Sequence, residues 1–144
     1  MAKLTQEMKD LIGTQQCYVA TVNPDGTPNI GPKRSTRVLD DDHLAFTEAT
    51  GNQTWRNVQR GSRVAIAAVD RDTMKGFRFV GSPELITAGE IFDQAVAGLR
   101  ARGIMAPVKG VVRIRVDGIL QLGGAGGRRA DRLILAAELS PRSR

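Results

Sequence analysis

KRSTRVLDDDHLAFTEATGNQTWRN, residues 33–57, places two β-prone runs directly before the start of a helix. The runs at 35–39 and 43–47 predict a hairpin around the aspartates at 40–42, because such polar clusters mark turns. Two antiparallel strands leading into a helix are therefore the unit from which the rest of the chain is interpreted.

Capping residues predict the helix that follows this hairpin. Thr50 and Gln53 have capping-box spacing, and Gly61 stands where a glycine after a helix C-terminus would. We expect this helix over 51–60. Thr5 is likewise the predicted N-cap of a short amphipathic helix near the N-terminus.

A longer helix is predicted further along the chain. Thr87 and Glu90 form a capping box, and the helix should end near Gly103. One stripe of this helix is apolar and is predicted to be core rather than part of a site: Ile91, Phe92, Ala95, Val96 and Leu99.

The remaining β-prone segments complete an antiparallel sheet. The residues from Asn23 to Gly26 predict a type I turn between strands at 15–22 and 27–31. Further strands are expected at 64–69, 77–80, 84–87 and 111–122. Because hairpins dominate the connections, the predicted fold is mainly β, an antiparallel barrel with flanking helices rather than a doubly wound α/β sheet.

The chain divides into one domain and a tail. Residues 1–122 carry the strand and helix patterns, whereas 123–144 is rich in glycine and arginine. The glycine spacing fits no phosphate-binding loop, so the start of the tail is interpreted as a linker. Residues 131–139 are a candidate terminal helix.

Composition sets limits on compartment and metal content. The 144 residues are 41% hydrophobic, which is enough for one core. No run approaches the roughly 18 apolar residues of a membrane span, and the N-terminus is no signal sequence, so we expect a cytoplasmic protein. Cys17 is the single cysteine and His43 the single histidine, which excludes an internal disulfide and a structural zinc site.

The charge of the chain gives little support to a nucleic-acid partner. The formal net charge is +6, and half of the excess lies in the last 22 residues. Aromatic residues make up 4% of the chain, too few for stacking platforms on single strands. Such a partner would have to bind through Lys33, Arg34, Arg37 and the basic tail.

Cations, hydroxyls and a helix start come together around the central hairpin, as phosphate binding requires. Lys33, Arg34 and Arg37 lie on one predicted strand, Thr47 ends the next, and 50–54 opens the helix. Pairing of the strands brings Lys33 or Arg34 toward the helix start. The alternative is that these basic residues simply face water.

Three segments, PNIGPK at 28–33, VLDDDHLAFT at 38–47 and GNQTWRNV at 51–58, resemble the pyridoxamine 5′-phosphate oxidase-like FMN-binding split barrels. The likeness extends more loosely over residues 4–122. It implies a six-stranded split barrel, a homodimer with two FMN sites at the subunit interface, and an oxidoreductase function.

The resemblance also implies which residues hold the cofactor. Lys33 and Arg34 match a basic region near the flavin, Thr47 matches a hydroxyl at a strand end, and Gln53 and Thr54 match residues that touch the phosphate. With their neighbours, the predicted cofactor-binding residues are Lys33, Arg34, Ser35, Thr47, Gly51, Asn52, Gln53 and Thr54.

The helix start departs from the family pattern. Larger oxidases carry a Ser-Arg-Lys run where this chain has Gly51, Asn52 and Gln53, so the phosphate would depend more on backbone amides and on the preceding basic residues. Split barrels of this architecture also take deazaflavin F420 or haem, and both stay open as alternatives. The chain lacks the longer C-terminal substrate-binding segment, so synthesis of pyridoxal phosphate is not expected.

The other chemically active residues have plainer interpretations. The aspartates at 40–42 are expected to solvate a turn rather than bind a metal, and His43 to lie at the surface. Cys17 should be a small buried hydrophobe, and Trp55 should pack its helix on the barrel rather than cover a flavin ring. No acid–base pair is visible, so a flavin would supply the chemistry. The alternative is a non-catalytic flavin store, sensor or interaction module.

Overall fold

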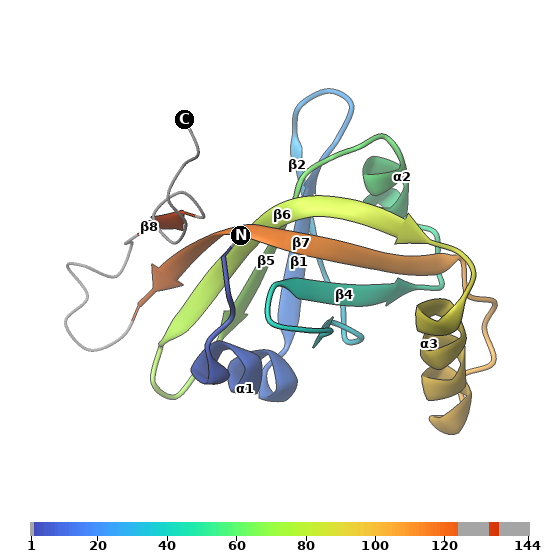
Figure 1. The fold of residues 1–144 in the computed structure, drawn as a ribbon. Helices are drawn as coiled ribbons and strands as arrows, with labels where there is room; N and C mark the ends of the chain where they lie inside the picture. Colours follow the sequence, from blue (N-terminus) through green and yellow to red (C-terminus); the bar gives the residue numbers. More distant parts are fainter. Residues whose placement is uncertain (1, 124–132, 136–144) are drawn as a thin grey trace, which may run out of the picture.

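Two long strands, β6 (Gly76–Ile86) and β7 (Gly110–Leu122), form the middle of the sheet. The computed structural model describes residues 2–123 and 133–135. The pairing of β6 with β7 shifts register between Val80 and Gly81. A Cβ atom on Gly81 would lie 2.0 Å from the carbonyl oxygen of Arg115, so only glycine allows this close approach. The two strands belong to a sheet that is curled (Figure 1).

The other strands extend the sheet on both sides of this pair. The path runs β2-β1-β5-β6-β7-β4-β3, β8 pairs with β7, and every pairing is antiparallel. The bounds of these strands are β1 (Cys17–Val22), β2 (Pro28–Pro32), β3 (Arg37–Val38), β4 (His43–Glu48), β5 (Val64–Val69) and β8 (Leu133–Leu135).

The predicted mainly β, antiparallel architecture is confirmed, but its details differ. The described residues form eight strands rather than six, and their sheet is the half-barrel of a split-barrel fold, with β2 and β3 at the ends of the path. Two predicted strands, at 77–80 and 84–87, are one continuous bent strand. The strand predicted over 35–39 shrinks to Arg37–Val38, because the chain turns between β2 and β3.

Within residues 2–123 and 133–135, three helices flank the sheet: α1 (Gln6–Thr14), α2 (Gln53–Gln59) and α3 (Glu90–Ala101) (Figure 1). The predicted N-cap of α1, Thr5, is confirmed, with a reciprocal contact to Met8. The capping boxes predicted for α2 and α3 are wrong.

Asn52 rather than Thr50 caps α2, and Gly89 precedes α3 without a side-chain cap. The hydroxyl of Thr50 bonds to Glu48 instead. None of the described helices is long and apolar enough to span a membrane.

The core fills the inside of the curled sheet, and α1 and α2 contribute to it. Fully buried side chains from five strands meet here, among them Val19, Phe46, Ile66, Phe79 and Ile114. Trp55 of α2 is 8% exposed and belongs to this cluster, as predicted. Of the terminal helix predicted over 131–139, residues 133–135 form β8, and the rest lies outside the described residues.

The outer face of β1, β2 and β5 is apolar at every position. Tyr18 and Ile30 are 47% and 68% exposed, although a solvated sheet face normally alternates with polar residues. The strand register places the following side chains together on this face: Tyr18, Ala20, Val22, Pro28, Ile30, Pro32, Ala65 and Ala67. We call these residues the outer apolar face.

Candidate functional site

A pocket of about 340 Å³ lies where the turn at 33–36, the end of β4, the start of α2 and the end of α3 meet. We call it the phosphate pocket. Five of the eight predicted cofactor-binding residues line it: Lys33, Arg34, Ser35, Thr47 and Asn52. The two strands and the helix start therefore converge as the sequence indicated, although Lys33 to Thr36 form a turn rather than a strand.

The other three predicted residues do not line this pocket. Gln53 donates to Asn57, 2.8 Å away, and Thr54 accepts a hydrogen bond from Asn29 at 3.1 Å while being only 3% exposed. Gly51 is in the left-handed region with φ +66° and donates its N–H to Glu48. These three residues hold the start of α2 in place.

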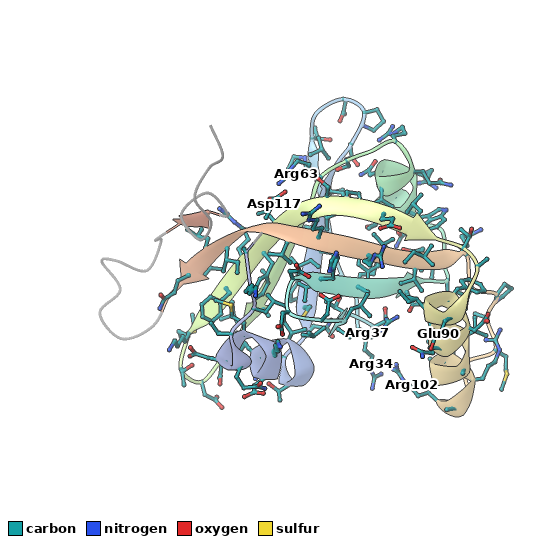
Figure 2. The ribbon with its side chains drawn as sticks, viewed as in Figure 1. Arg34, Arg37, Arg63, Glu90, Arg102 and Asp117 are labelled. Atoms are coloured by element: carbon teal, nitrogen blue, oxygen red, sulfur yellow. The ribbon has the colours of Figure 1, made fainter. Side chains whose placement is uncertain are left out.

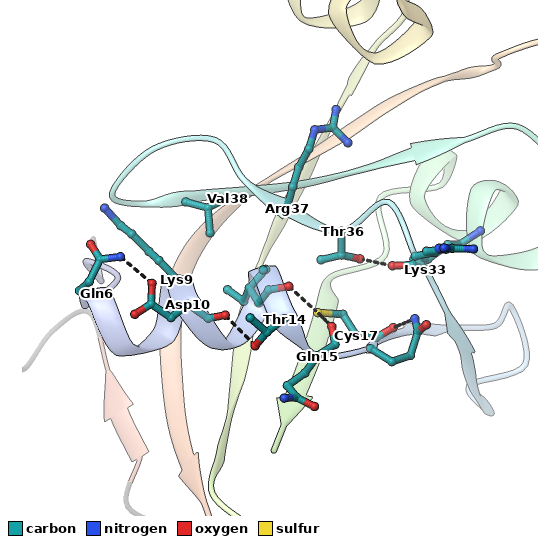
Figure 3. Close-up of a pocket in the computed structure, with 14 residues that line it drawn as sticks. Gln6, Lys9, Asp10, Thr14, Gln15, Cys17, Lys33, Thr36, Arg37 and Val38 are labelled. Carbon is teal, nitrogen blue, oxygen red and sulfur yellow. Dashed lines mark hydrogen bonds between the residues drawn. The ribbon is translucent and has the colours of Figure 1, made fainter. Parts of the chain in front are cut away.

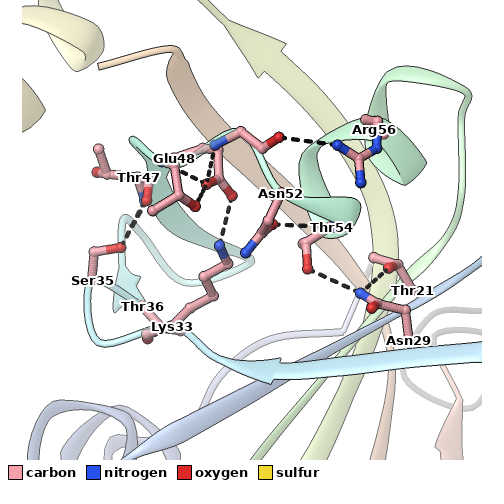
Figure 4. A network of polar contacts seen from close by, with 12 residues as sticks. Thr21, Asn29, Lys33, Ser35, Thr36, Thr47, Glu48, Asn52, Thr54 and Arg56 are labelled. Atoms are coloured by element: carbon pink, nitrogen blue, oxygen red, sulfur yellow. Dashed lines mark hydrogen bonds and ion pairs between the residues drawn. The ribbon is translucent and has the colours of Figure 1, made fainter. Parts of the chain in front are cut away.

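A carboxylate that sequence reasoning missed occupies the predicted anion position. Glu48 is 1% exposed, and its Oε2 lies 2.6 Å from Nζ of Lys33. Its Oε1 accepts from the N–H and the hydroxyl of Thr50, at 3.2 and 2.8 Å, and from the N–H of Gly51 at 3.1 Å (Figure 4). A cation, a hydroxyl and two amides thus already surround an anion that belongs to the protein itself.

The protonation of Glu48 follows from these contacts. Burial raises the pKa of this carboxyl, but hydrogen bonds from Lys33 and Thr50 outweigh burial and hold the pKa below its ordinary value. Glu48 is therefore ionised at neutral pH, and its charge neutralises Lys33. We call the group formed by Glu48, Lys33, Thr50 and Gly51 the Glu48 cradle.

Arg37 lies deeper than the sequence indicated. One of its Nη1 hydrogen bonds goes to the carbonyl of Ser35 at 3.0 Å and another to the hydroxyl of Thr47 at 3.1 Å. The hydroxyl of Ser35 accepts from the N–H of Thr47 at 2.9 Å, which ties the turn to β4. Burial lowers the pKa of Arg37, and both of its hydrogen-bond acceptors are neutral.

Two further arginines line the phosphate pocket without a side-chain partner among the described residues. Arg34 comes from the turn after β2, and Arg102 directly follows α3. Figure 2 shows both side chains in the region between β4 and α3. Arg102 was missed from the sequence because only the packing of α3 places it there. The uncompensated positive charge of the pocket therefore comes from Arg34 and Arg102.

A buried polar network joins α2 to the first hairpin and serves the fold. The amide of Asn57 donates to Thr21 and Asn23, at 3.0 and 2.9 Å, and Asn29 donates to Thr21 and Thr54. Because all these groups are satisfied by one another, they fix the helix start and its backbone relative to the sheet.

A larger pocket of about 670 Å³ separates α1 from the segment at 33–38 (Figure 3). Several charged residues line this pocket, including Lys33, Arg34 and Arg37. Another of them, Lys9, contacts Asp41 at 2.6 Å. Cys17 lies in this wall, but burial raises its pKa to about 11, which keeps it an unreactive thiol. His43 begins β4, at the end opposite Glu48, and contacts Asp40 and Asp42 at 2.8 and 2.7 Å. Neither residue is part of the phosphate pocket.

None of the described residues that line the phosphate pocket is a His, Cys or Tyr, and its single acid is held in the Glu48 cradle. The arrangement can bind and orient an anion, with the guanidinium of Arg34 and the amide NH2 of Asn52 as donors. The hydroxyl of Ser35 already donates to the carbonyl of Thr47 at 3.2 Å. Any electron transfer must come from a group that binds there.

Comparison with known proteins agrees with this geometry. A family model for pyridoxamine 5′-phosphate oxidase matches residues 4–123. HupZ of Group A Streptococcus is 43% identical with a TM-score of 0.76, and the alignment covers 85% of this chain and 99% of that one. The likeness spans the whole half-barrel.

Two more distant structures share the fold. An FMN-binding protein from Syntrophomonas wolfei is 18% identical with a TM-score of 0.68 and coverages of 83% and 86%. An F420 reductase is 19% identical with a TM-score of 0.62 and coverages of 81% and 98%. At these identities the likeness shows the fold alone. The family match and the 43% identity together show that this chain belongs to the pyridoxamine 5′-phosphate oxidase-like family of FMN-binding split barrels.

Proposed function

We propose that the protein binds FMN in the phosphate pocket and acts as a flavin-dependent oxidoreductase in the cytoplasm. The observation that carries the proposal is the convergence of Arg34, Ser35 and Asn52 on one pocket at the start of α2. A guanidinium, a hydroxyl and an amide are groups that hold a phosphate ester.

The residues present fit the phosphate and ribityl chain of a flavin. Arg34 supplies charge and the amide of Asn52 a neutral donor, while Ser35 can donate to the phosphate only by giving up its bond to the carbonyl of Thr47. Thr47 also lines the pocket, and its hydroxyl is fixed by Arg37. When bound, the flavin supplies the capacity to accept and pass on electrons, while these side chains bind and orient it.

The Glu48 cradle refines this assignment. Lys33 already has an anionic partner, so a phosphate in the same pocket meets the charge of Arg34 rather than that of Lys33. The loss of the Ser-Arg-Lys run at the helix start is thereby offset in part by an arginine from the turn.

An absorbance spectrum of the purified full-length chain, followed by titration with FMN, tests this function. We expect flavin bands on isolation or saturable binding of added FMN. A protein without bands that also fails to bind added FMN would refute the proposal.

The same titration separates the alternatives. Preference for F420 over FMN would move the protein to deazaflavin chemistry. Preference for haem over both flavins would move the protein to haem chemistry. Bound FMN that no nicotinamide donor or reductase reduces would identify a non-catalytic module.

We also propose that the outer apolar face joins two copies of the chain. The face holds no charged side chain, so two copies can pair through it without burying an unmatched charge. Its exposed members include Tyr18, Val22 and Ile30, which a solvated sheet does not favour.

Light scattering on the wild type and on Ile30→Lys tests the dimer. We expect a dimeric wild type and a monomeric variant, because the new charge would be buried without a partner. Met74→Lys is the matched control, since Met74 is also exposed, at 62%, but lies in the turn before β6. A monomeric wild type, or equal behaviour of the two variants, would contradict this interface.

A further inference from the structure

The apolar stripe of α3 is not the core element that the sequence predicts. Ala95 is its one buried member among the described residues, and it packs in a small cluster with Ala45 and Val111. Ile91 and Leu99 are only partly buried. The helix stands at the end of the sheet (Figure 1). Side chains of α3 and of Leu39, which follows β3, line a gap between them.

This gap is a second pocket of about 260 Å³. Its apolar wall comes from both sides, with Leu39 facing Ile91, Ala95 and Leu99 of α3. Its polar wall contains Arg37 and Arg102. We call it the α3 pocket.

The two arginines give the α3 pocket a charge that the described residues do not balance. Arg37 points away from α1 (Figure 3) and donates only to the neutral oxygens of Ser35 and Thr47. Arg102 has no side-chain partner among the described residues. No acid is present in the described lining of this pocket. Arg37 is half-buried and Arg102 is exposed, so both guanidinium groups remain accessible to an anion that enters the pocket.

We propose that the α3 pocket is a binding site for a small organic anion, one with a carboxylate or phosphate group attached to an apolar body. The anionic group lies between Arg37 and Arg102, because a planar guanidinium matches such oxyanions in pairs of hydrogen bonds. The apolar body lies against Ile91, Ala95 and Leu99. A pocket of mixed apolar and convergent polar lining is the usual form of a small-molecule site.

The α3 pocket adjoins the phosphate pocket. Both are lined by Ser35, Thr47, Leu99 and Arg102. A molecule in the α3 pocket is therefore placed next to the ligand of the other pocket, which makes it a position for a substrate of the proposed flavoprotein. The binding of the anion itself does not require the flavin.

Benzoate serves as the test ligand for the α3 pocket. Benzyl alcohol, which is similar in size but uncharged, is the control ligand. Titration of the ¹⁵N-labelled full chain should move the backbone amide signals of Ala95, Gly98 and Leu99 with benzoate, and much less with benzyl alcohol. Arg102→Gln should weaken benzoate by about tenfold or more, because a charged hydrogen bond is lost. Arg71→Gln, in the exposed turn after β5, should leave the affinity unchanged.

Arg37→Gln serves as a second variant, with a thermal melt to confirm that it folds. Equal benzoate affinity in Arg102→Gln and Arg71→Gln, or equal binding of benzyl alcohol and benzoate, would overturn the proposal. Mutual exclusion of benzoate and FMN would also overturn it, since the arginines would then belong to the flavin site. Benzoate binding that depends on Arg102 in a protein that binds no flavin would support this site while refuting the proposed function.

Discussion

Two groups of charged side chains lie around the turn after β2. One group is an ion pair, and the other consists of arginines without an acidic partner among the described residues. Lys33 and Glu48 are buried, in contact at 2.6 Å and matched in charge. Arg34 and Arg102 line the same pocket with no acid bound to them in the described part of the chain. Neighbouring residues of one basic run, Lys33 and Arg34, therefore serve different purposes.

The difference shows how the two uses of a basic residue can be told apart. A cation that is paired with an acid inside the fold stabilises the structure, because removing either partner leaves an unpaired buried charge. A cation that lines a concavity without an acid is available to a ligand. The Glu48 cradle belongs to the first kind, and the arginines around the two pockets belong to the second.

The largest expected effect comes from breaking the Glu48 cradle. Glu48→Ala should lower the free energy of unfolding by about 3–5 kcal/mol, because it leaves Lys33 unpaired and the donors of Thr50 and Gly51 without an acceptor. Urea denaturation measures this loss.

The exposed pair of Arg63 and Asp117, also 2.6 Å apart, is the matched control. Asp117→Ala should cost at most about 1 kcal/mol. If the two variants unfold at the same urea concentration, the cradle is not a structural element of the kind described.

The second-largest expected effect is a loss of stability at acidic pH, through protonation of Glu48. The pKa of Glu48 is lowered in the folded protein, so at acidic pH the unfolded state takes up a proton before the folded state does. The contribution of Glu48 is fully present above the pKa of an unfolded glutamate and is lost as pH falls through the lowered folded value. Glu48→Gln should therefore show a flatter decline of stability below neutral pH than the wild type. Parallel curves in urea titrations across this range would contradict the assignment.

A substitution in the loop that donates to Glu48 should lower the free energy of unfolding by a smaller amount. Gly51→Ala should cost about 1–2 kcal/mol, because the residue has φ +66° and a new Cβ would lie 2.1 Å from Cε of Lys109. Gly26→Ala is the control, since Gly26 has φ +86° but no neighbour within 4 Å of a new Cβ. The difference between the two in thermal denaturation isolates the contact with Lys109. A Gly51→Ala variant as stable as the wild type would show that the loop adjusts freely.

The unpaired arginines should affect stability least. Arg34→Gln and Arg102→Gln should each change the free energy of unfolding by no more than about 0.5 kcal/mol. Arg34→Gln should nevertheless weaken FMN by about tenfold relative to riboflavin, which lacks the phosphate. Fluorescence titration with the two flavins gives this ratio. If the ratio of FMN affinity to riboflavin affinity stays as in the wild type, Arg34 does not contact the phosphate.

Much of the fold follows from local patterns in the sequence. The turn at Asn23–Gly26 and the alternation along β7 each predict an element correctly, because they depend on neighbours in the chain. The caps of α2 and α3 were predicted wrongly because the side chain of Asn52 accepts from the N–H of Thr54 and starts α2 later, and because Gly89 takes a positive φ of +94° before α3.

The site was less predictable because its contacts join distant parts of the chain. Glu48 meets Lys33 only through the exact course of the turn at 33–36, which strand patterns do not define. Arg102 reaches the pocket through the packing of α3, although it stands 48 positions after Thr54, the last residue of the predicted site. The residue types of the proposed anion site could be read from the sequence, whereas the contact of Glu48 with Lys33 could not.

The central claim is that Lys33 pairs with Glu48 while Arg34 is available to a phosphate. A crystal structure of the chain with FMN tests this most directly. The account predicts a flavin phosphate within hydrogen-bond distance of Arg34 and Ser35, with Lys33 still in contact with Glu48. A phosphate bound to Lys33 in place of Glu48, or a flavin bound elsewhere on the chain, would contradict it.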